Sequence, residues 1–142
     1  KMLKLFTSKN ELKVISDQIG SPTSAEGLAE VCWKIINLKN KALIFKNNPN
    51  GILHWSDNGQ TSWFELAKTI RDLSLEIGLL KKNIRLIPIK TSDYISQAKR
   101  PNYSVLDSRN TKKILNINAN DWRKNLKDIL KKILVTRKSH KL

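Results

Sequence analysis

Residues 17–26 of the chain read Asp-Gln-Ile-Gly-Ser-Pro-Thr-Ser-Ala-Glu. This stretch is a polar turn that leads into a helix. Thr23 and Glu26 fit a capping box, with Thr23 as the N-cap and Glu26 three positions later. The apolar residues that follow share one helical face, which predicts a buried stripe. The stripe consists of Ala25, Leu28, Ala29, Cys32, Ile35 and Ile36.

Short apolar runs on both sides of this helix predict strands at residues 12–15, 52–55 and 84–89. Pro88 lacks an N–H, which favours either an edge position for the last of them or the end of that strand. Ser62 and Glu65 form a second capping box, and Gly78 is a suitable residue to end the helix that it opens. The predicted buried face of that helix consists of Trp63, Leu66, Ala67, Ile70, Leu73 and Ile77.

Three further helices are indicated. Residues 1–9 resemble the end of a helix, a short helix runs from Asp107 or Ser108 to Leu115, and the last begins near Asn120 or Asp121. Trp122, Leu126, Ile129, Leu130 and Ile133 form the apolar stripe of the last helix. Helices that alternate with strands predict a single α/β unit, and we expect the basic tail 136–142 to be frayed.

Composition limits the class of protein. The chain has 142 residues, of which 39% are hydrophobic, so it is long enough for one folded domain and too apolar for a disordered chain. No apolar window is long enough to span a membrane. The single cysteine, Cys32, excludes an internal disulfide, favours a reducing, cytoplasmic location, and on its apolar stripe is interpreted as a core residue.

The net charge of +15 raises the question of an anionic partner. Lysine supplies most of the cations, whereas nucleic-acid binders more often concentrate arginine or set cations among exposed aromatic residues. We therefore favour a solvated, lysine-rich surface over a nucleic-acid site.

Recognisable catalytic and cofactor motifs are missing. The five glycines lie too far apart for a dinucleotide or phosphate loop. Neither Tyr94 nor Tyr103 has a lysine four residues later, and His54 and His140 are too far apart to be interpreted as a metal pair. We therefore predict no catalytic, cofactor-binding or metal-ligating residue in this chain.

Four strings nevertheless occur in a familiar order and spacing, from residue 1 to about residue 134. They are residues 17–26 with Leu28-Ala29, residues 51–57 with 62–67, residues 100–107 and residues 121–126. Together they resemble the C-terminal, substrate-binding part of dTDP-4-dehydrorhamnose reductases, which are extended short-chain dehydrogenase/reductases. The chain departs from that family in its excess of lysine, in Leu53 and in its basic tail.

The resemblance implies that residues 1–142 are the substrate-binding domain of a longer enzyme. A separate N-terminal Rossmann domain would hold NADPH or NADH and a Tyr-x-x-x-Lys pair. The complete protein would reduce dTDP-4-dehydro-6-deoxy-L-mannose to dTDP-L-rhamnose, and this part alone would be inactive. The resemblance is compatible with a homodimer and leaves a role for magnesium open. The alternatives are a non-catalytic regulatory relative and a basic nucleic-acid-binding module.

The resemblance also suggests substrate-binding residues. Gln18 and the loop after it, with Gly20, Ser21, Pro22 and Thr23, would face the sugar, and N–H groups at the helix start could bind an anion. The alternative is a purely structural turn.

Arg100 is the second candidate. Pro101 holds Arg100 extended, and its guanidinium suits a diphosphate; the alternative is a surface ion pair. Trp55, Trp63 and Trp122 lie in element patterns and are interpreted as core residues rather than nucleotide-stacking ones.

Overall fold

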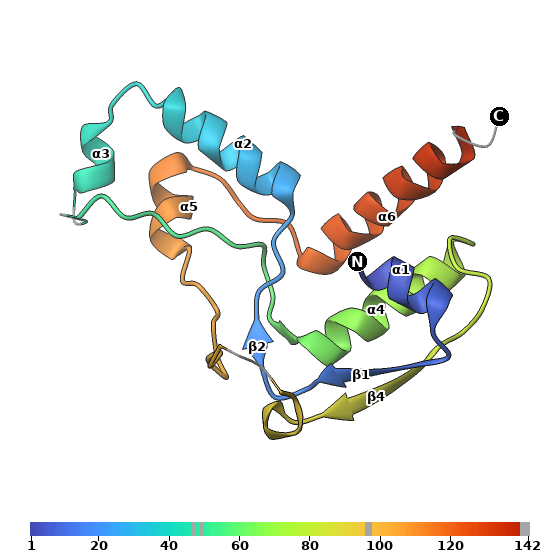
Figure 1. The fold of residues 1–142 in the computed structure, drawn as a ribbon. Helices are drawn as coiled ribbons and strands as arrows, with labels where there is room; N and C mark the ends of the chain where they lie inside the picture. The colour runs from blue at the N-terminus through green and yellow to red at the C-terminus, as the bar shows by residue number, and fades with distance from the viewer. Residues whose placement is uncertain (47, 49, 96–97, 140–142) are drawn as a thin grey trace.

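A computed structural model describes residues 1–46, 48, 50–95 and 98–139 (Figure 1). Helices alternate with short strands along the chain. The elements are α1 (Met2–Ser8), β1 (Glu11–Ile15), β2 (Ile19–Gly20), α2 (Ala25–Ile36), α3 (Ala42–Phe45), β3 (Thr61–Ser62), α4 (Trp63–Glu76), β4 (Arg85–Ile89), the 3-10 turn η1 (Thr91–Asp93), α5 (Arg109–Leu115) and α6 (Trp122–Ser139).

The main core lies between one pair of strands and the helices that cover it. β1 and β4 are parallel, with Val14 opposite Pro88, and α1 and α4 pack against them (Figure 1). Both strands predicted near these positions are therefore confirmed. The buried cluster here consists of Phe6, Val14, Ala67, Leu80 and Ile84.

Helix α4 begins and ends where its sequence predicts. The Ser62 hydroxyl accepts a hydrogen bond from the backbone N–H of Glu65 at 3.1 Å. Gly78 follows the helix with φ of +74°, a left-handed conformation that glycine adopts without steric cost. Ala67 is completely buried, but Trp63 is 52% exposed, so its predicted place in the core is wrong. Trp63 is the first residue of the helix.

Helix α2 differs more from its prediction. The N-cap is Ser24, not Thr23: its hydroxyl accepts from the N–H of Gly27 at 3.0 Å. Val31 is buried, and it lies outside the predicted stripe. Most of the stripe is instead exposed, including Cys32, whose predicted place in the core is therefore wrong. The packed face is rotated because α2 meets its neighbours through Val31 rather than through Leu28 and Cys32.

Residues 52–55 do not form a strand, contrary to prediction. No described strand lies alongside to accept their backbone hydrogen bonds, so their apolar pattern alone is not sufficient. Residues after them instead hold helices together. The buried Asp57 carboxylate accepts from the N–H of Ser24 at 3.0 Å and from Nδ2 of Asn125 in α6 at 2.7 Å.

Helix α6 follows its predicted stripe closely, with Trp122 and Leu130 buried. The helix extends to Ser139, so residues 136–139 of the tail that we expected to fray are helical. The remainder of that tail, residues 140–142, lies outside the described residues. Within the described part of the chain, no helix is both long enough and apolar enough for a membrane span.

Candidate functional site

Three distant segments meet at Ile19 in β2. On one side β2 pairs antiparallel with β3, with Ile19 opposite Ser62. On the other side the N–H of Ile19 donates to the carbonyl of Asn102 at 2.8 Å, and the N–H of Ser104 donates to the carbonyl of Ile19 at 2.9 Å. These backbone bonds bring three of the four strings from the sequence to one place.

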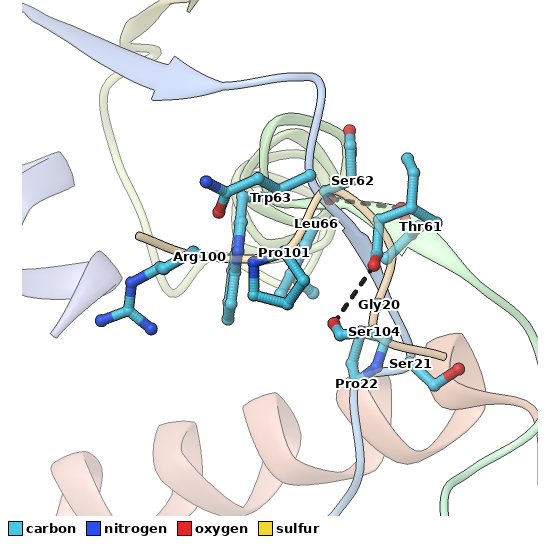
Figure 2. Close-up of a pocket in the computed structure, with 12 residues that line it drawn as sticks. Gly20, Ser21, Pro22, Thr61, Ser62, Trp63, Leu66, Arg100, Pro101 and Ser104 are labelled. Carbon is cyan, nitrogen blue, oxygen red and sulfur yellow. Dashed lines mark hydrogen bonds between the residues drawn. The ribbon is translucent and has the colours of Figure 1, made fainter. Parts of the chain in front are cut away.

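A cavity of about 300 Å³ opens where the three segments meet (Figure 2). Its walls come from β2 and the turn after it, from β3 with the first turns of α4, and from the segment that follows Arg100. The lining residues are Gln18, Ile19, Gly20, Ser21, Pro22, Thr61, Ser62, Trp63, Leu66, Arg100, Pro101 and Ser104.

Of the six substrate-binding residues suggested by the sequence, five line this cavity. Gln18, Gly20, Ser21 and Pro22 come from its β2 side, and Arg100 comes from the opposite segment. Thr23 does not line the cavity: its side chain is exposed, and its hydroxyl donates to the carbonyl of Ser21 at 3.2 Å. Thr23 therefore shapes the turn rather than the wall.

Gly20 allows the segments to approach closely. A Cβ atom at this position would lie 3.1 Å from the hydroxyl oxygen of Ser104, tighter than most such contacts. The same hydroxyl donates to the carbonyl of Ile19 at 3.2 Å. A side chain at position 20 would therefore require the Ser104 hydroxyl to move by a few tenths of an ångström from the position in which it donates to Ile19.

Gln18 is 5% exposed and is held by the 3-10 turn η1. Its Nε2 donates to Oγ1 of Thr91 at 3.1 Å. Asp17, the preceding residue, accepts from Oγ1 of Thr91 at 2.7 Å and from the Thr91 N–H at 3.0 Å. These hydrogen bonds from Thr91 lower the pKa of the Asp17 carboxyl below its ordinary value.

Trp63 is the cavity residue that sequence reasoning wrongly assigned to the core. Its indole lies beside Leu66 and Pro101 at the cavity (Figure 2). Helical periodicity assigned it to the core, because Trp63 and Leu66 share a face of α4. The signal that could have found it was the string around Ser62, which the resemblance already contained.

Arg100 lies at a junction between two cavities. A second cavity, of about 260 Å³, is lined by Thr91, Tyr94, Lys99 and Asn102 among others, and it shares Gln18 and Arg100 with the first. Within the described part of the chain Arg100 forms no salt bridge, which argues against the alternative of a surface ion pair. Its guanidinium keeps its donors available for a ligand.

The described residues do not supply a metal centre. No group of three or more His, Cys, Asp or Glu side chains lies close enough together among residues 1–46, 48, 50–95 and 98–139. The arrangement is instead that of a binding cavity, with an indole, a buried amide, small hydroxyl groups and a guanidinium.

The fold and the cavity define a ligand-binding α/β domain. The chain belongs to the RmlD substrate binding domain family, whose model matches residues 1–135. The spore coat polysaccharide biosynthesis protein SpsK of Bacillus subtilis is 37% identical over 91% of this chain and 40% of its own length. The dTDP-4-dehydrorhamnose reductase of Aggregatibacter actinomycetemcomitans is 33% identical over 90% of this chain and 42% of its own length.

Solved structures agree with these matches. A dTDP-4-dehydrorhamnose reductase from Clostridium acetobutylicum superimposes with a TM-score of 0.75 at 29% identity, over 94% of this chain and 42% of that one. The enzyme of Bacillus anthracis in complex with NADP gives 0.69 at 28% identity, over 89% and 39%. The chain therefore spans about two fifths of the relatives that it matches. The predicted family and α/β fold are confirmed.

Proposed function

We propose that this chain is the substrate-binding part of an NAD(P)H-dependent dTDP-4-dehydrorhamnose reductase. In the complete protein, dTDP-4-dehydro-6-deoxy-L-mannose would be reduced to dTDP-L-rhamnose. The family match supports this proposal, as do the names of its relatives, among them reductases and a polysaccharide biosynthesis protein. The family match over residues 1–135 disfavours a nucleic-acid-binding module.

The observation that carries the proposal is the cavity at Ile19. It places the Arg100 guanidinium, the Trp63 indole and the Gln18 amide around one space. A guanidinium suits the diphosphate of a nucleotide sugar, because its planar fork can bind two oxygens at once. An exposed indole suits a base or a sugar face, and a buried amide suits a sugar hydroxyl.

We further propose that the nicotinamide cofactor binds outside residues 1–142. A dinucleotide needs closely spaced glycines, and Gly51, Gly59 and Gly78 each serve a separate turn with positive φ. We assign NADPH or NADH to an N-terminal Rossmann domain, which would also supply the proton donor. A Bacillus anthracis relative in complex with NADP supports the choice of cofactor. The cytoplasmic location and the homodimer stay predictions.

The test is the kinetic effect of Arg100→Ala in the full-length protein. A charge-assisted hydrogen bond is worth roughly 1.5–3 kcal/mol, so KM should rise about ten- to a hundredfold. The kcat should stay within a few-fold, because the contact is made equally in the ground state and the transition state. Arg100→Lys should recover part of the loss, since it keeps the charge without the planar fork.

Arg137→Ala is the matched control, because Arg137 is an exposed arginine near the end of α6 and does not line the cavity. Its KM should equal that of the wild type. An unchanged KM in Arg100→Ala would remove Arg100 from the proposed site. A wild-type protein that reduces no dTDP-linked keto sugar would contradict the function itself.

A further inference from the structure

The hydrogen bonds between Asp17, Thr91 and Gln18 have a fixed direction. An ionised carboxylate can only accept hydrogen bonds, so the single proton of the Thr91 hydroxyl must point to Asp17, 2.7 Å away. The ordinary pKa of an aspartate already lies well below neutral pH, and the hydrogen bonds from Thr91 lower the pKa of Asp17 further, so this carboxyl is ionised. The backbone N–H of Thr91 donates to the same carboxylate at 3.0 Å, which fixes η1 against residue 17.

The direction of the Thr91 hydroxyl determines the orientation of Gln18. With its proton used, Oγ1 of Thr91 can only accept, so the amide nitrogen of Gln18 must face it, as the 3.1 Å contact shows. The reverse orientation of the amide would place two oxygens against each other. The remaining atom, Oε1, is an acceptor, and no described N–H or O–H group donates to it. Gln18 is one of the residues that line both cavities.

We propose that Asp17 and Thr91 are positioning residues that orient the Gln18 amide so that its Oε1 accepts a hydrogen bond from a hydroxyl of the bound sugar. This inference rests on the proposed function and specifies the sugar subsite. A sugar hydroxyl can donate a hydrogen bond to the oriented Oε1 atom. A keto or carboxylate oxygen at the same position carries a negative partial charge, as Oε1 does, and the two oxygens would repel each other. The three residues therefore select for a sugar with a free hydroxyl at that position.

The test compares two ligands on the full-length protein by titration calorimetry. The probes are dTDP-L-rhamnose, which carries the sugar, and dTDP, which lacks it. Thr91→Val removes the hydroxyl with little change of shape, and it should weaken binding of dTDP-L-rhamnose about tenfold. Binding of dTDP should stay within twofold, because the proposal assigns Gln18 to the sugar and not to the nucleotide. Thr91→Ser keeps the hydroxyl, so this variant should bind both probes with wild-type affinity.

Thr7→Val is the matched control. The Thr7 hydroxyl donates only within α1, to the carbonyls of Leu3 and Lys4, so its loss should change neither affinity. Equal weakening of both probes by Thr91→Val would show a general disturbance of the site, and no weakening would show that the amide needs no positioning. Either result overturns the inference and leaves the proposed function standing. A wild-type protein that binds neither probe would overturn both.

Discussion

Helices α2 and α4 begin alike and end up in different surroundings. In both, a serine hydroxyl accepts from the N–H three residues later, Ser24 from Gly27 and Ser62 from Glu65. Both sequences carry an apolar stripe at helical spacing. The residues of α4 that face β1 and β4 are covered, whereas α2 buries Val31 and leaves Trp33 64% exposed.

The difference between the two helices shows that a sequence predicts the start of a helix better than it predicts which face of the helix is buried. A cap is local, because donor and acceptor lie three residues apart. Burial of a stripe depends on elements far away in the chain, and α4 has β1, β4, α1 and α6 around it. Helix α2 instead depends on a remote contact at its start, the Asp57 carboxylate. Three experiments, from the largest expected effect to the smallest, test how local and remote contacts contribute.

The largest expected effect is on the core beneath α4. Phe6→Ala removes a fully buried aromatic ring from the cluster that contains Ala67 and Ile84. Because the surrounding side chains fill the void left by the ring only in part, the free energy of unfolding should fall by about 3–5 kcal/mol. Trp33→Ala on α2 should change it by less than about 0.5 kcal/mol, because the exposed indole has little packing to lose. Urea unfolding measures both.

A large loss of stability in Trp33→Ala would break the comparison. It would mean that the apolar face of α2 is covered in solution, and that the two helices differ less than their exposed fractions indicate.

The intermediate effect concerns the N-terminus of α2. Asp57→Ala leaves the backbone N–H of Ser24 without its acceptor, and it leaves the Asn125 amide only a longer contact of 3.4 Å with the Ser24 hydroxyl. Stability should fall by about 1–3 kcal/mol, the usual cost of unsatisfied buried donors. Hydrogen exchange should quicken in the first turn of α2 and stay unchanged in the first turn of α4. Equal quickening in both helices would show that Asp57 supports the whole fold rather than α2.

The smallest effect concerns the start of α5, where the Asp107 carboxylate accepts a hydrogen bond from the backbone N–H of Arg109. We expect a change in the pKa of that carboxyl. Arg109 forms a salt bridge of 2.6 Å with Asp107, and its hydrogen bonds lower the pKa of that carboxyl from 3.8 to about 2. The folded pKa is the lower one, so the pair contributes stability above about pH 4 and loses it as the pH falls toward 2. Both side chains are exposed, so the contribution is small.

Carbon-detected NMR of the Asp107 carboxyl measures this pKa directly. Arg109→Gln should return it toward 3.8. A wild-type value already near 3.8 would show that the pair does not persist in solution.

Much of this fold follows from short-range patterns. The starts of α2, α4 and α6 were predicted to within one or two residues, and β1 and β4 were found from their apolar runs. Residues 52–55 have the same kind of run and form no strand, because a strand needs a neighbour that composition does not reveal.

The cavity shows a similar limit. Gln18 and Arg100 were suggested because their strings resemble a family, and both line the cavity. Trp63 was wrongly assigned to the core. Helical periodicity identifies the apolar face of a helix, but it does not show whether another segment of the chain covers that face. Thr91 was missed altogether, since its contact with Gln18 spans 73 residues of sequence.

The central claim is that the cavity at Ile19 binds a dTDP-linked sugar. Titration of dTDP-L-rhamnose into the isotope-labelled full-length protein, followed through backbone amide resonances, tests it most directly. Among residues 1–142, the account predicts saturable shifts centred on Gln18–Ser21, Thr61–Trp63, Arg100 and Asn102–Ser104, together with the Trp63 indole. Shifts spread over the lysines of α6, with none at Gly20 or Trp63, would contradict it.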